Sequence, residues 1–253
     1  MKGGNSPLKS KLRSGGYTII EVMIVLAVSG VMFVIAANFI NGKQANASFT
    51  SGVNDMKTYI QDVIDDVNDG RFSDKRISCT DAGSDSDPLS ISVDEEGGQG
   101  VNPKCVFLGK LLVSPVGTDK QKFETVSLAG LRSATNLADA RVTSVTGGED
   151  VDLTVTSRVP QGLEIARIKV NGGVTSTNVG FVQSYGQQNA DSVYESAVQN
   201  VSMVYGSLDN LQTANNVVIC LTDGTRYATI TLGDNHNQLA ARAKLKVPES
   251  ECV

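Results

Sequence analysis

The sequence has few of the residues from which enzyme active sites are usually built. It contains no tryptophan and one histidine, His236, and aromatic residues make up only 5% of the chain. A Ser-His-Asp or Cys-His catalytic arrangement would have to use His236, which lies in the polar, turn-like run GDNHN. We interpret this histidine as a solvated loop residue and predict that the protein is not an enzyme.

Motifs for nucleotides and metals are also missing. The chain has neither a G-x-x-x-x-G-K-S/T nor a G-x-G-x-x-G motif, and its four cysteines form no C-x-x-C pair that would suit zinc. The run DAGSDSDP places Asp81, Asp85 and Asp87 close together, as in an oxygen-rich calcium loop. The spacing does not match an EF-hand and no glutamate closes the run. We therefore favour a solvated acidic loop over a calcium site, and we predict no cofactor.

The charge is unevenly distributed. The chain has a net charge of -5, although the segment before Tyr17 carries four cations and no acid. The rest of the chain is therefore more acidic than the net value suggests. An acidic body argues against a general nucleic-acid binder, although it leaves room for a local basic patch.

What the sequence does have is a long apolar run near its start, RSGGYTIIEVMIVLAVSGVMFVIAANFI, at residues 13–40. The segment 17–40 is long enough to span the ~30 Å hydrocarbon core as a helix, and the cations of residues 2–13 would stay cytoplasmic. Glu21 lies near the head of this run. A carboxylate in hydrocarbon costs on the order of 2.5–3.5 kcal/mol, so its presence needs a reason.

Two common types of segment leave Glu21 unexplained. An ordinary secretory signal peptide would be cut before Ser48, after the A-x-A-like Ala45-Asn46-Ala47, but it has no use for an acid at its head. A plain transmembrane anchor accounts for the apolar run but for neither Glu21 nor the Gly15-Gly16 pair.

The stretch GGYTIIEVMIVLAVSGVMF resembles the prepilin signal of type IV pilins and type II secretion pseudopilins. The resemblance implies that prepilin peptidase cuts after Gly16 on the cytoplasmic side, that Tyr17 becomes N-methylated, and that the apolar helix is kept. The glutamate that this family carries falls at Glu21. Two departures are mild: Tyr17 replaces the usual Phe or Met, and Asn38 stands where many pilins have a helix-kinking proline.

The resemblance also gives Glu21 a role in assembly. In a filament, the apolar helices pack in a central bundle, where Glu21 would meet the positive amine of a neighbouring Tyr17. A paired charge in an apolar core fixes the register between neighbouring helices, because a helix that slides along its neighbour leaves two buried charges without partners.

Helical periodicity continues beyond the apolar run. Phe49, Val53, Met56, Ile60, Val63 and Val67 recur at steps of three and four residues, with polar residues between them. This pattern predicts an amphipathic helix that ends near Asn68-Asp69-Gly70 and continues the first, for about 75 Å at ~1.5 Å per residue. The alternative is two helices broken at Asn41-Gly42.

From Lys75 onward, short runs rich in Val, Ile, Leu and Thr predict strands, punctuated by Gly, Asn and Asp. The runs are KCVFLGKLLVSP, VDLTVTSRVP, LEIARIKV, VGFVQSY, NNVVICLTD, RYATITL and ARAKLKV. Asp223-Gly224 predicts a two-residue hairpin turn between two of them. The segment 192–204 is patterned like a short helix.

The fold class we expect is therefore α+β. The resemblance implies a pilin fold, a long N-terminal helix with a transmembrane first half, packed on an antiparallel β-sheet head. The corresponding parts are a leader at residues 1–16, a transmembrane or filament-core helix at 17–40, its amphipathic continuation at 41–70, and a β-rich head at 71–253.

The four cysteines follow the membrane signal, and their even number favours disulfides in an oxidising compartment. Of the three possible pairings we favour Cys79–Cys105 and Cys220–Cys252, because each closes a short loop. The alternative is four buried free thiols.

The C-terminal part, NNVVICLTDGTRYATITLGDNHNQLAAR, resembles the hairpin of the GspH/FimT family of minor pseudopilins and minor pilins. Just after it, ARAKLKV places Arg242, Lys244 and Lys246 on one face of a strand, opposite Ala243, Leu245 and Val247. Minor pilins related to FimT bind DNA through basic C-terminal segments, so the resemblance makes DNA contact an alternative for this face. We favour a solvated, edge-protecting strand face.

The expected function is that of a structural subunit, minor rather than major, of a type IV pilus or of a type II secretion or competence pseudopilus. Its partners would be prepilin peptidase, other pilin subunits, the assembly ATPase and platform protein, and the cytoplasmic membrane. It would start as a single-pass membrane protein with its head outside the cytoplasm and end in an extracellular filament. The alternatives are a major pilin and a secreted or anchored surface-binding module.

Overall fold

The computed structural model describes residues 18–70, 77–80, 90–93, 105–115, 117–131, 143–144, 154–183, 201–208, 210–233 and 239–252. Within these ranges, the side chains of residues 37–42, 77–80, 90–93, 105–106, 131 and 143–144 are not described. The chain divides into two compact units, Met1–Ala47 and Ser48–Val253.

Helix α1 runs from Ile19 to Asn68, 50 residues in all. The prediction of one continuous helix is confirmed, and the alternative of a break at Asn41-Gly42 is wrong. The end at Asn68 agrees with the predicted stop. There the side-chain amide of Gln183 donates to the carbonyl of Val67 at 2.9 Å, which satisfies one of the carbonyls that a helix end leaves without a partner.

In the second unit, α1 buries the apolar stripe that its periodicity predicts. The buried side chains are the six predicted ones and, in addition, Ile64: Phe49, Val53, Met56, Ile60, Val63, Ile64 and Val67. They form one continuous core with side chains from the strands. Burial of apolar surface against the sheets therefore holds this half of the helix.

The strands among the described residues form three antiparallel sheets. A two-stranded sheet pairs β1 (Ile77–Thr80) with β2 (Ser90–Val93). A seven-stranded sheet has the order β11-β10-β9-β3-β4-β5, and β6 also pairs with β4. Its strands are β3 (Cys105–Val113), β4 (Lys122–Leu131), β5 (Thr143–Ser144), β6 (Thr154–Arg158), β9 (Asn178–Gln183), β10 (Val201–Ser207) and β11 (Asn210–Ala214).

A five-stranded sheet, called sheet D here, has the order β14-β13-β12-β7-β8. Its strands are β7 (Glu164–Val170), β8 (Val174–Ser176), β12 (Val217–Thr222), β13 (Tyr227–Leu232) and β14 (Arg242–Val247). The short 3-10 helix η2 (Pro160–Gly162) precedes β7, and a second short helix, α2 (Glu249–Cys252), follows β14. The predicted fold class, a long N-terminal helix with antiparallel sheets, is confirmed and is consistent with the pilin fold.

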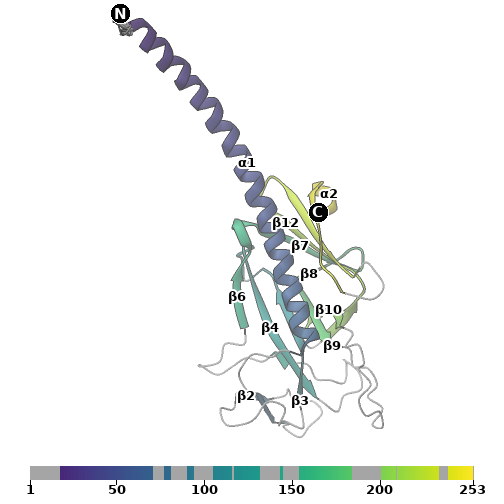
Figure 1. Cartoon of the computed structure of the whole chain (residues 1–253). Helices are drawn as coiled ribbons and strands as arrows, with labels where there is room; N and C mark the ends of the chain where they lie inside the picture. Colours follow the sequence, from purple (N-terminus) through teal and green to yellow (C-terminus); the bar gives the residue numbers. More distant parts are fainter. Residues whose placement is uncertain are drawn as a thin grey trace, which may run out of the picture. The chain divides into compact units, whose positions relative to one another are not determined.

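The second half of α1 lies along the strands of the two larger sheets, as Figure 1 shows for β7, β12, β4 and β10. One core contains the buried helix residues, the inward side chains of sheet D and those on one face of the seven-stranded sheet. A second, smaller cluster around Leu108, Leu111 and Leu128 contains other buried side chains of the seven-stranded sheet. The helix is thus the shared packing partner of both larger sheets.

Four polar contacts add to this packing, and each joins α1 to a different part of the head. The Lys110 ammonium in β3 lies 2.6 Å from the Asp66 carboxylate. The hydroxyls of Tyr59 and Thr125 (β4) are 2.7 Å apart. The backbone N–H of Ala241, just before β14, donates to the side-chain oxygen of Gln61 at 3.1 Å. The contact between Gln183 (β9) and Val67 is the fourth.

Two local predictions need correction. The short helix predicted for residues 192–204 is wrong over its last four residues, because Val201–Ser207 is strand β10, paired on both sides by β9 and β11. The predicted hairpin between β12 and β13 is present, but its central residues are Gly224 and Thr225. The N–H of Asp223 donates to the carbonyl of Arg226 at 3.4 Å and closes the turn one residue later than predicted.

Candidate assembly site

The start of α1 is fixed by a side-chain cap. The hydroxyl of Thr18 accepts the backbone N–H of Glu21 at 3.3 Å, and the carbonyl of Thr18 accepts that of Val22 at 3.2 Å. Thr18 and Glu21 are spaced as in a capping box, in which the first residue satisfies an N–H that the helix leaves free. Our sequence reasoning did not single out Thr18, although the pattern T-x-x-E before an apolar run is a known sign of a helix start.

Glu21 also lies in the first turn of α1, and its side chain is exposed. A negative charge there interacts favourably with the partial positive charge of the helix N-terminus. Gly16 and Tyr17, the predicted cleavage and methylation residues, lie outside the described residues.

The helix that follows Glu21 is apolar on every side. Ile19–Ala36 has a mean hydropathy of 2.7 and is, by length and composition, able to cross a membrane. Its large side chains are exposed, including Ile19 at 79% and Phe33 at 75%. Glu21 is the only charged residue in this window. A helix that is hydrophobic all round requires an apolar environment, either lipid or other helices.

Within the second unit, a tight contact holds α1 at its first buried turn. Gly52 of α1 lies against the segment that connects β6 to β7. A Cβ atom at residue 52 would come within 2.9 Å of Leu163 Cδ1 and 3.0 Å of the Pro160 carbonyl oxygen. One turn earlier, the guanidinium of Arg226 lies over the ring of Phe49, 4.5 Å from its centroid. This cation–π contact joins the β12–β13 turn to the helix.

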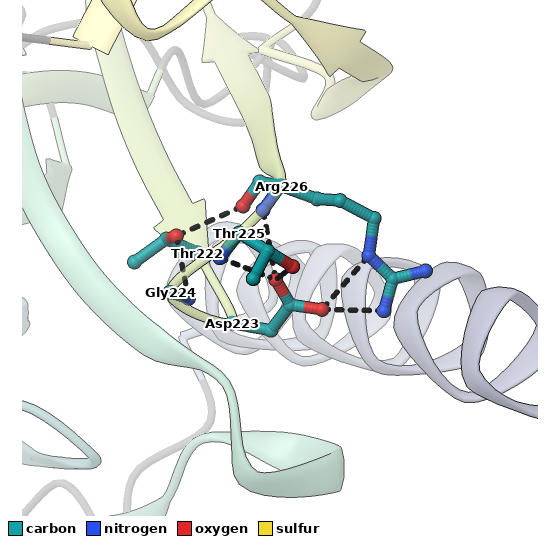
Figure 2. A network of polar contacts seen from close by, with 5 residues as sticks. All are labelled: Thr222, Asp223, Gly224, Thr225 and Arg226. Atoms are coloured by element: carbon teal, nitrogen blue, oxygen red, sulfur yellow. Dashed lines mark hydrogen bonds and ion pairs between the residues drawn. The ribbon is translucent and has the colours of Figure 1, made fainter.

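Figure 2 shows how the turn itself is built. One carboxylate oxygen of Asp223 accepts the N–H of Thr225 at 3.0 Å, its hydroxyl at 2.9 Å and the N–H of Arg226 at 2.8 Å. The other oxygen accepts the Nε–H of Arg226 at 2.8 Å and a second guanidinium N–H. Gly224, at a φ of 89°, occupies a left-handed conformation at the first central position, as in type II′ turns. Asp223 therefore orients Arg226 over Phe49.

These contacts change the acidity of Asp223. Burial raises the pKa of its carboxyl, but the hydrogen bonds from Arg226 and Thr225 outweigh burial and hold the pKa well below its ordinary value of 3.8. The folded protein thus binds this proton less readily than the unfolded chain. Asp223 therefore stabilises the fold fully at pH values above the ordinary pKa of 3.8. This contribution is lost as the pH falls from 3.8 toward the lowered pKa of the folded protein.

We expect Asp223→Asn to lower the free energy of unfolding at neutral pH and to flatten its decline in acid, because the variant has no carboxylate to protonate at this position. Urea unfolding of the full chain in detergent at pH 7, 4 and 3 would measure this. Asp55→Asn, on the exposed face of α1, is the matched control. An equally steep loss of stability in acid for Asp223→Asn would contradict the assignment.

The C-terminal end of the chain is fastened to sheet D. Cys220 of β12 and Cys252 of α2 form a disulfide across 32 residues of sequence, which is the second of the two predicted pairs. Cys220 is fully buried and Cys252 is 2% exposed. The hydroxyl of Tyr227 donates to Glu249 at 3.2 Å, and burial and this carboxylate raise the tyrosine's pKa. Helix α2 is thus held by one covalent and several polar contacts.

Replacing both Cys220 and Cys252 by alanine is expected to lower the free energy of unfolding by about 2–5 kcal/mol, the usual effect of losing a native disulfide. The urea midpoint of the full chain, measured without reductant, would show it. Glu249→Gln, which weakens only the contact with Tyr227, should move the midpoint far less. Equal midpoints for the double variant and the wild type would refute the stabilising role.

The basic strand differs from its prediction. Arg242 pairs with Thr231 and Lys244 with Thr229, so these two cations share a face, but the register shifts before Val247 and Lys246 adopts a φ of 58°. The predicted alternation therefore ends at Leu245, and the three cations do not form one stripe. Ala243 and Leu245 are exposed as well, because β14 is an edge strand. Lys244 contacts both oxygens of Glu251 at 3.1 Å, which offsets its charge.

The remaining predicted site residues are not placed. Asp81, Asp85, Asp87 and His236 lie outside the described residues, as do the side chains of Cys79 and Cys105. In the ranges whose side chains are described, no group of three or more His, Cys, Asp or Glu residues is arranged to hold a metal ion.

Comparison with known proteins bears on the start of the chain. The family model of the prokaryotic N-terminal methylation motif matches residues 11–37. Comparison with curated proteins and with solved structures finds no match. The matched segment contains Gly16, Tyr17, Glu21 and most of the exposed apolar helix. Residues 11–37 therefore carry the N-terminal methylation motif of type IV pilin-like subunits, which are processed by prepilin peptidase.

Proposed function

We propose that this protein is a structural subunit, without catalytic activity, of a type IV pilus or of a type II secretion or competence pseudopilus. Prepilin peptidase cuts the chain after Gly16, and Tyr17 is N-methylated. The subunit waits in the cytoplasmic membrane with its head outside the cytoplasm. An assembly ATPase and platform protein then insert it into an extracellular filament together with other pilin subunits.

One observation carries this proposal, namely that the methylation motif opens a helix that keeps a single carboxylate within an otherwise apolar window. The 18 residues Ile19–Ala36 are exposed, and an apolar surface of this kind is stable in a membrane and in a bundle of like helices. The same helix continues to Asn68 and packs in its second half on antiparallel sheets. The continuity of this helix supports a subunit that keeps its apolar segment after processing.

The mature N-terminus is the decisive measurement. Mass spectrometry of the protein from the membrane fraction should find a chain that begins at an N-methylated Tyr17. A chain that begins at Ser48 would instead indicate a secreted surface-binding module, and an uncut chain would indicate a plain anchor.

We further propose that the subunit is a minor one. The C-terminal hairpin β12–β13 carries the residues that resemble the GspH/FimT family, and the chain of 253 residues is longer than the main subunit of a filament usually is. The subunit content of sheared filaments would test this: we expect a small share, whereas a dominant share would identify a major pilin.

A further inference from the structure

Strand β6 forms an open edge of the seven-stranded sheet. It pairs with β4 on one side (Figure 1), and no strand among the described residues pairs with its other side. The N–H of Val159 donates to the carbonyl of Gln121, which fixes the bonding pattern of the β4–β6 ladder. Because bonding alternates along an antiparallel pair, Val155 turns its backbone groups toward β4, whereas Thr156 and Arg158 turn theirs toward the open side.

The inner side of this edge carries an uncovered apolar side chain. Val155 lies directly opposite Thr125 of β4, so both side chains point to the face that α1 covers. The hydroxyl of Thr125 lies 2.7 Å from that of Tyr59 in α1. Val155 is nevertheless 54% exposed, the highest value among the large apolar side chains described in the second unit. The helix therefore covers β4 but leaves the next strand open.

The side of α1 that faces this edge is acidic. Asp55 and Asp62 lie four residues before and three residues after Tyr59, so they share its side of the helix. Both side chains are exposed. Asp55 accepts the Ser51 hydroxyl at 3.4 Å, and in the part of the chain that the structure describes neither carboxylate forms an ion pair. Their negative charge is therefore available to a ligand beside β6.

The edge of β6 lacks the features that protect another edge of the head. Strand β14, at the edge of sheet D, carries Arg242, Lys244 and Lys246, and its register shifts before Val247. Cations and bulges of this kind keep further strands from pairing. Strand β6 keeps one register with β4 over its five residues, TVTSR, and its only cation is Arg158 at the end. Its β-branched residues favour extended structure, so this edge is able to accept another strand.

We propose that the edge of β6 binds an extended, basic segment of a different protein by strand addition. The backbone of this segment bonds to the outward N–H and C=O groups of Thr156 and Arg158. An added strand lies about 4.8 Å beyond β6 and sends alternate side chains to the face of α1. The side chain opposite Val155 is apolar. A side chain two residues away is lysine or arginine, because it faces Asp55 or Asp62.

The test measures binding of a synthetic peptide to the full chain in detergent. The probe is a fluorescently labelled peptide, TKTVTKTVT, in which lysine and valine alternate on one side of the extended chain. Its anisotropy should rise in a saturable manner with wild-type protein. Thr156→Pro should weaken binding about tenfold or more, because proline removes an N–H that the peptide accepts. That N–H points away from β4, so proline leaves the β4–β6 ladder intact.

Three controls make the outcome specific. Thr156→Ala keeps the backbone N–H and should bind the peptide as the wild type does. The same peptide with all of its backbone amides methylated cannot donate hydrogen bonds and should not bind, which tests strand addition on the unaltered protein. The peptide TETVTETVT should not bind the wild type but should bind a variant with both Asp55→Lys and Asp62→Lys, because the charges are then complementary again.

Equal binding of the methylated peptide, or full binding by Thr156→Pro at an unchanged urea midpoint, would overturn the proposal. Self-association of the wild type that Thr156→Pro abolishes, measured by sedimentation in the same detergent, would identify a second copy as the occupant and would also overturn it. The proposal goes beyond the filament function and fails separately from it. A chain cut at Tyr17 that binds no peptide refutes strand addition alone.

Discussion

Gly16→Val is expected to stop maturation, so that the full-length precursor accumulates in the membrane and none of the protein enters a filament. The proposed cut follows residue 16, and a branched side chain there would obstruct the backbone where the peptidase must bind it. The loss should be nearly complete, because every later step needs the free amine of Tyr17. Precursor size on a gel of the membrane fraction, with mass spectrometry of the N-terminus, measures it.

Gly16→Ala is the matched control. A single methyl group should be tolerated, and most of the chain should still begin at Tyr17. Normal processing of Gly16→Val would show that the cut lies elsewhere. Precursor accumulation with both variants would show that the position tolerates no side chain at all, a stricter requirement than we infer.

Glu21→Gln is expected to be inserted and cut normally but to be excluded from filaments. Removing a charge only eases insertion into hydrocarbon. In the filament, however, the amine of a neighbouring Tyr17 would lose its partner in an apolar bundle, and an uncompensated buried charge costs about 3–5 kcal/mol. That corresponds to a loss of incorporation of roughly a hundredfold or more. Precursor size in membranes and subunit content of sheared filaments are the two measurements.

The choice of glutamine separates the charge of Glu21 from its place in the helix cap. Glutamine suits the third helical position of a capping box as well as glutamate does, so the bond from the Glu21 backbone N–H to Thr18 should persist. Glu21→Leu removes charge and side-chain cap together and should behave the same way or worse. Normal incorporation of Glu21→Gln would show that docking does not need the carboxylate. Failure at cutting would instead indicate a role in peptidase recognition.

Local patterns predicted the helix well but the contacts across the sheets poorly. The buried stripe from Phe49 to Val67 followed from its periodicity, because every member belongs to one helix face. Strand β10 was missed because its partners β9 and β11, and not its own residues, make Val201–Ser207 a strand. The bulge at Lys246 likewise depends on how β14 pairs with β13, which the alternation of ARAKLKV does not record.

In the candidate site, too, residues with a local sequence signal were predictable, whereas contacts between distant residues were not. Glu21 was predicted because its signal is local, namely a carboxylate within an apolar run. Thr18 could have been predicted from an equally local signal, its spacing of three residues from Glu21. The contact of Arg226 with Phe49 joins residues that are far apart in the sequence, and no short motif announces it. The outer cations of sheet D were only half visible in the sequence, because register alone brings Arg167 and Lys169 of β7 into rows with Arg242 and Lys244.

The four polar contacts between α1 and the rest of the head affect how the head would respond to mechanical force. The helix residues in these contacts are Gln61, Tyr59, Asp66 and Val67. Their partners lie in the segment before β14, in β4, in β3 and in β9, respectively, so the contacts are spread over the last turns of the helix. A pull along the helix axis would load these four contacts in parallel, so that each carries part of the force. A pull at right angles would peel them one after another. The head is therefore built to resist tension along its helix better than bending away from it.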